Sequence, residues 1–152
     1  MTAYIVSSGV LSSGLVLGHL DTLSVLGGGA AISIADRGLE QVASGGAASA
    51  TTVFGGGILQ LSAGASANGV TISAGGIVSG AGLLRGTVTD AGVIDGNAIG
   101  TSSDASGADA VFVLSGGRAS GATIEAGGSI NVFGGGATTV RLGSCGGAGG
   151  SG

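Results

Sequence analysis

Glycine clusters separated by short apolar runs recur along this chain, and this repeat limits its fold more than any other feature. The stretch "TTVFGGGILQLSAG" at 51–64 shows the pattern, with three glycines between two runs of three to five residues. Runs of this length with alternating apolar residues are typical of strands and are too short for helices. Glycine makes up 37 of 152 residues and proline none, so glycine is expected to form the turns, where it adopts positive φ without steric penalty.

Two interleaved series of apolar residues give the repeat its period. One series has a hydroxyl residue followed by Val or Ile, and the other has an apolar residue, a spacer and Val or Leu. Together they predict a unit of about 16–20 residues containing strand, turn, strand and turn. The first series predicts one inward face, and the second predicts another: Ile34, Val53, Ile72, Val88, Ile124 and Val140, then Val25, Val42, Leu61, Val78, Val113 and Val132.

Such a unit can form either a meander of hairpins or a stack of coils. Stacking is favoured because like residues recur at the unit period and would lie on one another. The hairpin dipeptide Asn-Gly occurs at Asn68-Gly69 and does not recur. We therefore expect an all-β fold, a single-stranded parallel β-helix (β-solenoid) with about 16–20 residues per coil, in which each coil buries its apolar face against its neighbours.

Changes in composition divide the chain into segments. The stretch "GNAIGTSSDASGADA" breaks the repeat and is expected to be an irregular loop or a joint, and the last ten residues contain almost no apolar side chains. Cys145, the single cysteine, lies in this tail and permits no internal disulfide. The expected segments are a first or capping coil at 1–26, solenoid repeats at 27–95, the loop at 96–110, further repeats at 111–142 and a flexible tail at 143–152.

The charge pattern argues against two classes of partner. The net charge is −4, and the four cations are scattered arginines that form no basic patch for phosphates. No apolar run approaches the ~20 residues of a membrane helix. The N-terminus lacks a basic region before an apolar core, so no ordinary secretory signal peptide is expected. We expect no nucleic-acid partner and no membrane-spanning segment.

Residues that could perform chemistry are few. His19, the one histidine, stands near Asp21 in "LGHLDTL", which predicts a turn whose aspartate bonds nearby backbone. The glycine pairs are not followed by the aspartate of calcium-binding β-rolls, and no phosphate loop is complete. We expect no catalytic, cofactor-binding or metal-binding residues. The alternative is a solenoid polysaccharide hydrolase or lyase with an acidic site near residues 90–109, formed by Asp90, Asp95, Asp104 and Asp109.

Outward columns of polar residues are the remaining feature. If Val53 points inward, Thr52 and Phe54 point outward. A second outward column is expected to contain Ser24, Gln41, Gln60 and Asn131, with amides bonded along the stack. The hydroxyl column can reflect the strand preference of threonine, glycan attachment, or a carbohydrate- or ice-binding face. Its expected members are Ser33, Thr52, Thr71, Thr87, Thr123 and Thr139.

The stretches "AYIVSSGVLSSGLVLGHLDTLSVLGGGA" and "VASGGAASATTVFGGGILQLSAG" resemble the AIDA-type adhesin repeats of bacterial autotransporter passengers and related secreted repeat proteins. The resemblance covers roughly residues 4–95 and 111–142. It implies a right-handed parallel β-helix on the bacterial surface or secreted, which provides a rigid stalk or interaction surface for adhesion and autoaggregation. The implied partners are proteins or glycans of host or neighbouring cells and further copies of the chain. Some members of this family carry O-linked glycans on repeat Ser and Thr.

Overall fold

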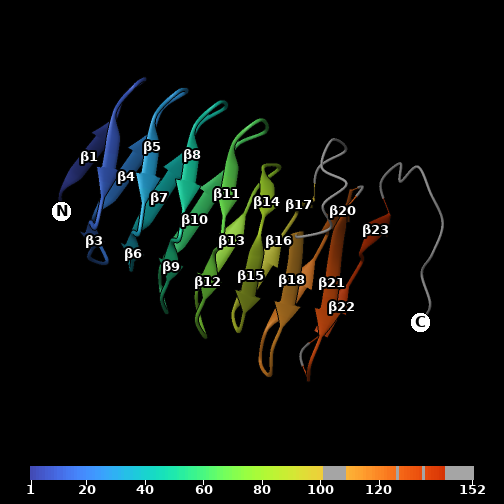
Figure 1. Ribbon diagram of the computed structural model, residues 1–152. Coiled ribbons are helices and arrows are strands. Elements are labelled where there is room, and N and C mark those ends of the chain that lie inside the picture. Colours follow the sequence, from blue (N-terminus) through green and yellow to red (C-terminus); the bar gives the residue numbers. More distant parts are fainter. Residues whose placement is uncertain (101–108, 126, 135, 143–152) are drawn as a thin grey trace.

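The strands of the computed structural model stack in three parallel sheets, so that each coil adds one strand to each sheet (Figure 1). The structure describes residues 1–100, 109–125, 127–134 and 136–142, and these contain no helix. Each strand pairs with its counterpart one coil later, which confirms the all-β solenoid. Sheet A contains eight strands: β1 (Ala3–Val6), β4 (Thr22–Val25), β7 (Leu39–Val42), β10 (Ile58–Leu61), β13 (Ile77–Ser79), β16 (Val93–Asp95), β19 (Arg118–Ser120) and β22 (Gly136–Thr138).

The other two sheets follow the same order along the stack. Sheet B contains eight strands: β2 (Leu11–Ser13), β5 (Ala30–Ile32), β8 (Ala47–Ser49), β11 (Ser66–Asn68), β14 (Leu83–Arg85), β17 (Ala98–Ile99), β20 (Thr123–Ile124) and β23 (Arg141–Leu142). Sheet C contains seven: β3 (Val16–Leu17), β6 (Ala35–Asp36), β9 (Thr52–Val53), β12 (Thr71–Ile72), β15 (Thr87–Asp90), β18 (Asp109–Val113) and β21 (Gly128–Val132).

The core runs along the axis of the stack. It is filled by the side chains at alternate positions of each strand, which point inward. Leu23, Leu59 and Ile94 of sheet A and Leu84 of sheet B are among its largest buried side chains. Sheet B otherwise contributes mainly alanine, so the core stays narrow. Burying a Val or Leu side chain contributes about 1.5–3 kcal/mol. Because each coil is buried only by its neighbours, this stabilisation comes from stacking.

Three kinds of corner connect the sheets. The corner from sheet B to sheet C has two residues in each of the first four coils, and its first residue has positive φ, as at Gly69 (66°) and Ala50 (53°). The corner from sheet C to sheet A has four residues after Val53 or Ile72 but only two after Asp36 and Asp90. The short corners therefore shorten two coils.

The short corners explain why the predicted inward rows were partly wrong. Val53 and Ile72 do share a row, and the other members of that row include Asp36 and Asp90. Ile34 lies in the neighbouring inward row, one coil before Thr51. Three of the misplaced residues lie elsewhere: Ile124 is in sheet B, and Val132 and Val140 are 45% and 36% exposed.

In the second predicted row, Val25, Val42 and Leu61 pair in sheet A as expected. Val78 pairs with Leu59 instead of Leu61, and Val113 lies in sheet C. Where a coil is two residues shorter, an apolar residue still stands near the expected spacing, but it belongs to another row. Matching apolar residues alone therefore predicts the wrong strand register there.

The strands are distributed over the predicted segments as follows. Residues 1–26 contain β1 to β4, and they begin the stack. Within 96–110, strand β17 pairs with both neighbours, and β18 begins at Asp109. Residues 101–108 and the tail at 143–152, with Cys145, lie outside the described residues. The described part of the chain has no helix that is long and apolar enough to cross a membrane.

Candidate functional site

A continuous row of polar side chains crosses the outer face of sheet A and is the clearest candidate interaction surface. Gln41 pairs with Ser24 on one side and with Gln60 on the other, so the three lie on successive strands. The Gln41 amide donates from Nε2 to Gln60 Oε1 at 3.0 Å. The predicted amide bond along the stack is thus confirmed. We call these side chains, with their counterparts on the next three strands, the polar row: Ser24, Gln41, Gln60, Ser79, Asp95 and Ser120.

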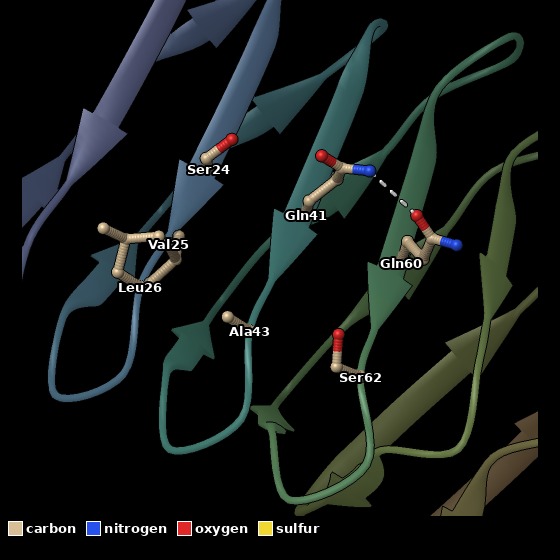
Figure 2. A pocket seen from close by; sticks show the side chains of 7 residues that line it. All are labelled: Ser24, Val25, Leu26, Gln41, Ala43, Gln60 and Ser62. Atoms are coloured by element: carbon tan, nitrogen blue, oxygen red, sulfur yellow. Dashed lines mark hydrogen bonds between the residues drawn. The ribbon is translucent and has the colours of Figure 1, made fainter.

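A shallow groove of about 230 Å³ borders the polar row near its N-terminal end. Figure 2 shows the two glutamines joined across β7 and β10, with a second line of side chains where the strands turn. This second line is Leu26, Ala43 and Ser62. The groove therefore presents hydroxyl and amide groups on one side and small or apolar groups on the other. Such a surface suits a ligand rich in hydrogen-bonding groups.

Asn131, the fourth predicted member of this column, lies on sheet C, where it pairs with Phe112. The rings of Phe112 and Phe133 stack with centroids 6.1 Å apart. Phe54 lies in the corner that follows β9 of the same sheet, with the Arg37 guanidinium 4.0 Å from its ring centroid. The phenylalanines thus lie on or next to sheet C, whereas the polar row lies on sheet A, beside an outward row that contains Ile58 and Ile77.

The six residues of the predicted hydroxyl column do not form one column. Thr52 and Thr71 do pair in sheet C, but the next member is Thr89 and not Thr87, which pairs with Ala110. Ser33 and Thr139 lie at left-handed corners with φ of 56°, and Thr123 lies in sheet B. The row on sheet C therefore contains three threonines, Thr52, Thr71 and Thr89. The role of these six residues in glycan attachment or binding stays a prediction.

The acids near residues 90–109 do not converge on one site in the described part of the chain. Asp95 belongs to the exposed polar row, whereas Asp90 is fully buried. Asp109 Oδ1 accepts a hydrogen bond from the Gly86 amide. Asp104 lies outside the described residues. Within those residues no group of three or more His, Cys, Asp or Glu could hold a metal ion.

His19 lies exposed in the corner between β3 and β4, as predicted. Asp21 in the same corner bonds backbone, again as predicted: Oδ2 accepts from the Gly18 amide at 3.0 Å and Oδ1 from the Thr2 amide at 2.6 Å. These bonds lower the pKa of the Asp21 carboxyl. The N-terminal ammonium lies 3.7 Å from Oδ1. This corner is a structural turn that ties the first strand to the second coil.

Sequence reasoning missed the buried acids of the core. Asp36, Glu40 and Asp90 have no exposed surface. Burial raises the pKa of Asp36 to about 6 against the lowering effect of the Gly38 amide, and it raises the pKa of Asp90 to about 6 against the Gly92 and Arg118 amides. Burial and the nearby Asp36 carboxyl raise the pKa of Glu40 to about 8. The available signal was Asp-x-Gly in "DRGLE" and "DAGVI", where other coils have a longer corner.

No protein-family model and no curated protein matches the chain. Among solved structures, the chain is similar to a crystallised, TibC-catalyzed hyper-glycosylated TibA fragment. The two share 17% sequence identity with a TM-score of 0.37, and the similarity covers 93% of this chain and 89% of the fragment.

Proposed function

We propose that this chain is a non-enzymatic rod segment of a bacterial surface or secreted protein, and that it provides a stalk and an interaction surface for adhesion and autoaggregation. The observation that carries the proposal is the polar row of sheet A, where the Gln41–Gln60 bond fixes two exposed amides across neighbouring coils. The resemblance of the repeats to AIDA-type adhesin sequences supports the same role.

The stack suits this role because its binding groups are fixed before any partner arrives. Gln41 and Gln60 hold each other, so less side-chain freedom is lost on binding than for two independent glutamines. The partners are surface proteins or glycans of host or neighbouring cells, or a second copy of the chain. Each offers the hydroxyl and amide groups that the groove can bind.

The test is a bead assay with the purified chain. Beads coated with the chain are mixed with each other and with bacterial or epithelial cells, and clumping and attachment are counted. The Gln41→Ala/Gln60→Ala variant is expected to weaken attachment about tenfold, since it removes two exposed hydrogen-bonding groups. Ser49→Ala/Asn68→Ala, a paired set of polar side chains on the outer face of sheet B, is the matched control. Attachment unchanged by the glutamine changes contradicts the proposed surface.

The alternative is an enzyme that acts on polysaccharide through exposed acids, and Asp95 at the surface is the observation that favours it. Polysaccharide turnover by the chain that Asp95→Asn abolishes would overturn the non-enzymatic role. The buried Asp90 is no part of this test, because changing it alters the core.

A further inference from the structure

Two carboxyl side chains lie inside the solenoid where its second coil passes into its third. Asp36 ends β6, and Glu40 follows it in β7 after the two-residue corner Arg37–Gly38. Neither side chain is exposed. Glu40 stands in an inward row whose adjacent members on β4 and β10 are Leu23 and Leu59. An acid thus occupies a position that its neighbours fill with leucine.

The polar atoms of this cluster are largely unpartnered. Within the described residues, no hydrogen bond of ordinary geometry reaches either oxygen of Glu40, Asp36 Oδ2 or Thr51 Oγ1. Asp36 Oδ1 alone accepts one, from the Gly38 amide at 2.9 Å. Thr51 has no exposed surface, and its hydroxyl is near enough to Glu40 to offset part of the rise in the pKa of that carboxyl.

No positive charge compensates the pair within the described residues. The inward residues paired with Asp36 are Leu17 of β3 and Val53 of β9, and those paired with Glu40 are leucines. The nearby charged or titratable groups lie outside the core. The Arg37 guanidinium covers the Phe54 ring, the Asp21 carboxylate is bonded to the Thr2 and Gly18 amides, and His19 lies at the surface beside Gly56.

Two buried carboxylates without a counter-charge are incompatible with a stable core. Burying a single uncompensated ion costs several kcal/mol, and a second like charge beside it adds repulsion. A proton removes both penalties, because a neutral carboxylic acid is much cheaper to bury and its O–H can donate to a free oxygen nearby. Asp36 Oδ2 and Thr51 Oγ1 are the free acceptors in the cluster.

We propose that the Asp36–Glu40 pair is a proton lock, which keeps the second and third coils stacked while Glu40 carries a proton. In alkaline solution hydroxide takes this proton and forms water, which leaves two carboxylates in the core. The stack then opens at β6 and β7 before it opens elsewhere.

The pKa shifts give the pH range of the lock. Burial, followed by the Asp36 charge, raises the pKa of Glu40 to about 8, and burial raises that of Asp36 to about 6. Both folded-state values lie above the ordinary carboxyl values of 4.5 and 3.8. The folded state therefore binds more protons than the unfolded state between these limits. Stability is highest in acid and falls as pH rises through about 6 and then 8.

The first test follows thermal unfolding by circular dichroism from pH 5 to pH 9.5. The wild-type melting temperature is expected to fall by about 10 °C over this range. Glu40→Leu, which continues the Leu23–Leu59 row, is expected to remove most of this fall, and Glu40→Gln removes the titration while keeping the shape. Glu125→Gln is the matched control. Wild-type and Glu40→Leu curves with the same pH slope overturn the lock.

The second test needs no core variant. The chain has two glutamates, Glu40 and Glu125, so selective ¹³C labelling of Glu carboxyls gives two signals, which Glu125→Gln assigns. The Glu40 signal is expected to stay protonated up to about pH 8. A Glu40 midpoint near its ordinary value overturns the proposal, whatever the variants do. So does recovery of the alkaline melting temperature by added calcium chloride, because a cation and not a proton would then neutralise the pair.

The position of the opening is tested by hydrogen exchange with mass spectrometry, corrected for the intrinsic effect of pH. At pH 9 peptides covering 35–53 are expected to lose protection before peptides covering 77–99. Equal loss in the two regions contradicts a local lock and indicates unfolding of the whole stack.

Discussion

Two corners of the solenoid have the same backbone plan but different surroundings. At both, a buried aspartate ends a strand of sheet C, and its Oδ1 accepts a hydrogen bond from the glycine amide two residues later, at 2.9 Å for Asp36 and for Asp90. After the first corner comes Glu40, whereas the equivalent residue after the second is Ile94. In the next coil Asp36 pairs with Val53 and Asp90 with Val113, and the inward residue two positions before that partner is Thr51 at the first corner but Val111 at the second.

The comparison separates two roles of a buried acid. The aspartate belongs to the short corner itself, because its carboxylate replaces the backbone partner that a longer turn would supply. The glutamate does not belong to the corner, since the Asp90 corner forms without one. Glu40 and Thr51 therefore add a second titrating group and further unpartnered polar atoms to a turn that is otherwise the same at both corners.

Transplanting the acid should give the largest effect. Ile94→Glu places a second carboxyl beside Asp90, with Val111 in place of the threonine. We expect the free energy of unfolding to drop by about 4 kcal/mol at pH 9, because an uncompensated charge is forced into the core, and by less at pH 5, where the carboxyl is neutral. Urea unfolding at the two pH values measures this. Ile94→Gln is the control, and an equal loss at both pH values would show that shape and not charge is responsible.

The glycines of the two corners should be equally intolerant of a side chain. A Cβ at Gly38 would collide with the Asp21 and Gly18 carbonyl oxygens, and one at Gly92 with the Gly76 carbonyl oxygen. These contacts are with backbone, which cannot move aside without breaking the ladder. Gly38→Ala and Gly92→Ala are each expected to lose about 2–3 kcal/mol in urea unfolding. If one is neutral, the two corners are not the same structure in solution.

Removing the charge of each corner aspartate should sharpen the comparison further. Asn keeps the oxygen that accepts from the glycine amide but does not titrate. The raised pKa of Asp90, about 6, means that stability is present below pH 4 and is lost as pH rises through 6. Asp90→Asn is expected to remove about 1–2 kcal/mol of pH dependence between pH 4 and 8. Urea unfolding across this range measures it.

Asp36→Asn should remove a similar contribution but leave the fall near pH 8 that belongs to Glu40. The stability of Asp36→Asn is therefore expected to fall near pH 6 because of Asp90 and near pH 8 because of Glu40. The stability of Asp90→Asn is expected to fall in the same two ranges, but there because of Asp36 and Glu40. Loss of the fall near pH 8 in Asp36→Asn would show that Glu40 titrates there only because Asp36 is charged.

The same two corners show what could be read from the sequence. The repeat, the parallel stacking and the Gln41–Gln60 bond were predictable, because like residues recur at the coil period and stack on one another. The predicted strand register was wrong where Asp36 and Asp90 occupy inward positions that are apolar in other coils. Matching Ile34 to Val53 gives an apolar row, but it ignores the two-residue corner. The burial of Glu40 was missed for the same reason. An acid in a strand of alternating residues is expected to point outward, and only the pairing with the neighbouring strands shows that Glu40 points inward.

The smallest expected effect lies at the corner from sheet B to sheet C in the coil that contains Glu40. Ala50 has φ of 53°, whereas the equivalent residue in the coil after Asp90 is Gly100 with φ of 90°. The left-handed conformation costs a residue with Cβ about 1–2 kcal/mol, while glycine loses about 0.5–1 kcal/mol more on folding because its unfolded chain is freer. The first term is larger, so Ala50→Gly is expected to stabilise the fold by about 0.5 kcal/mol.

The matched control for Ala50 is Gly69→Ala, one coil further along the same corner. Gly69 has φ of 66°, and a Cβ there meets nothing within 4 Å, so the variant measures the conformational cost alone. It should lose about what Ala50→Gly gains, and urea unfolding at pH 5, where the lock is closed, reads both without interference from Glu40. If Ala50→Gly destabilises while Gly69→Ala behaves as expected, the alanine is held by contacts of its own, and the N-terminal region is less strained than its backbone indicates.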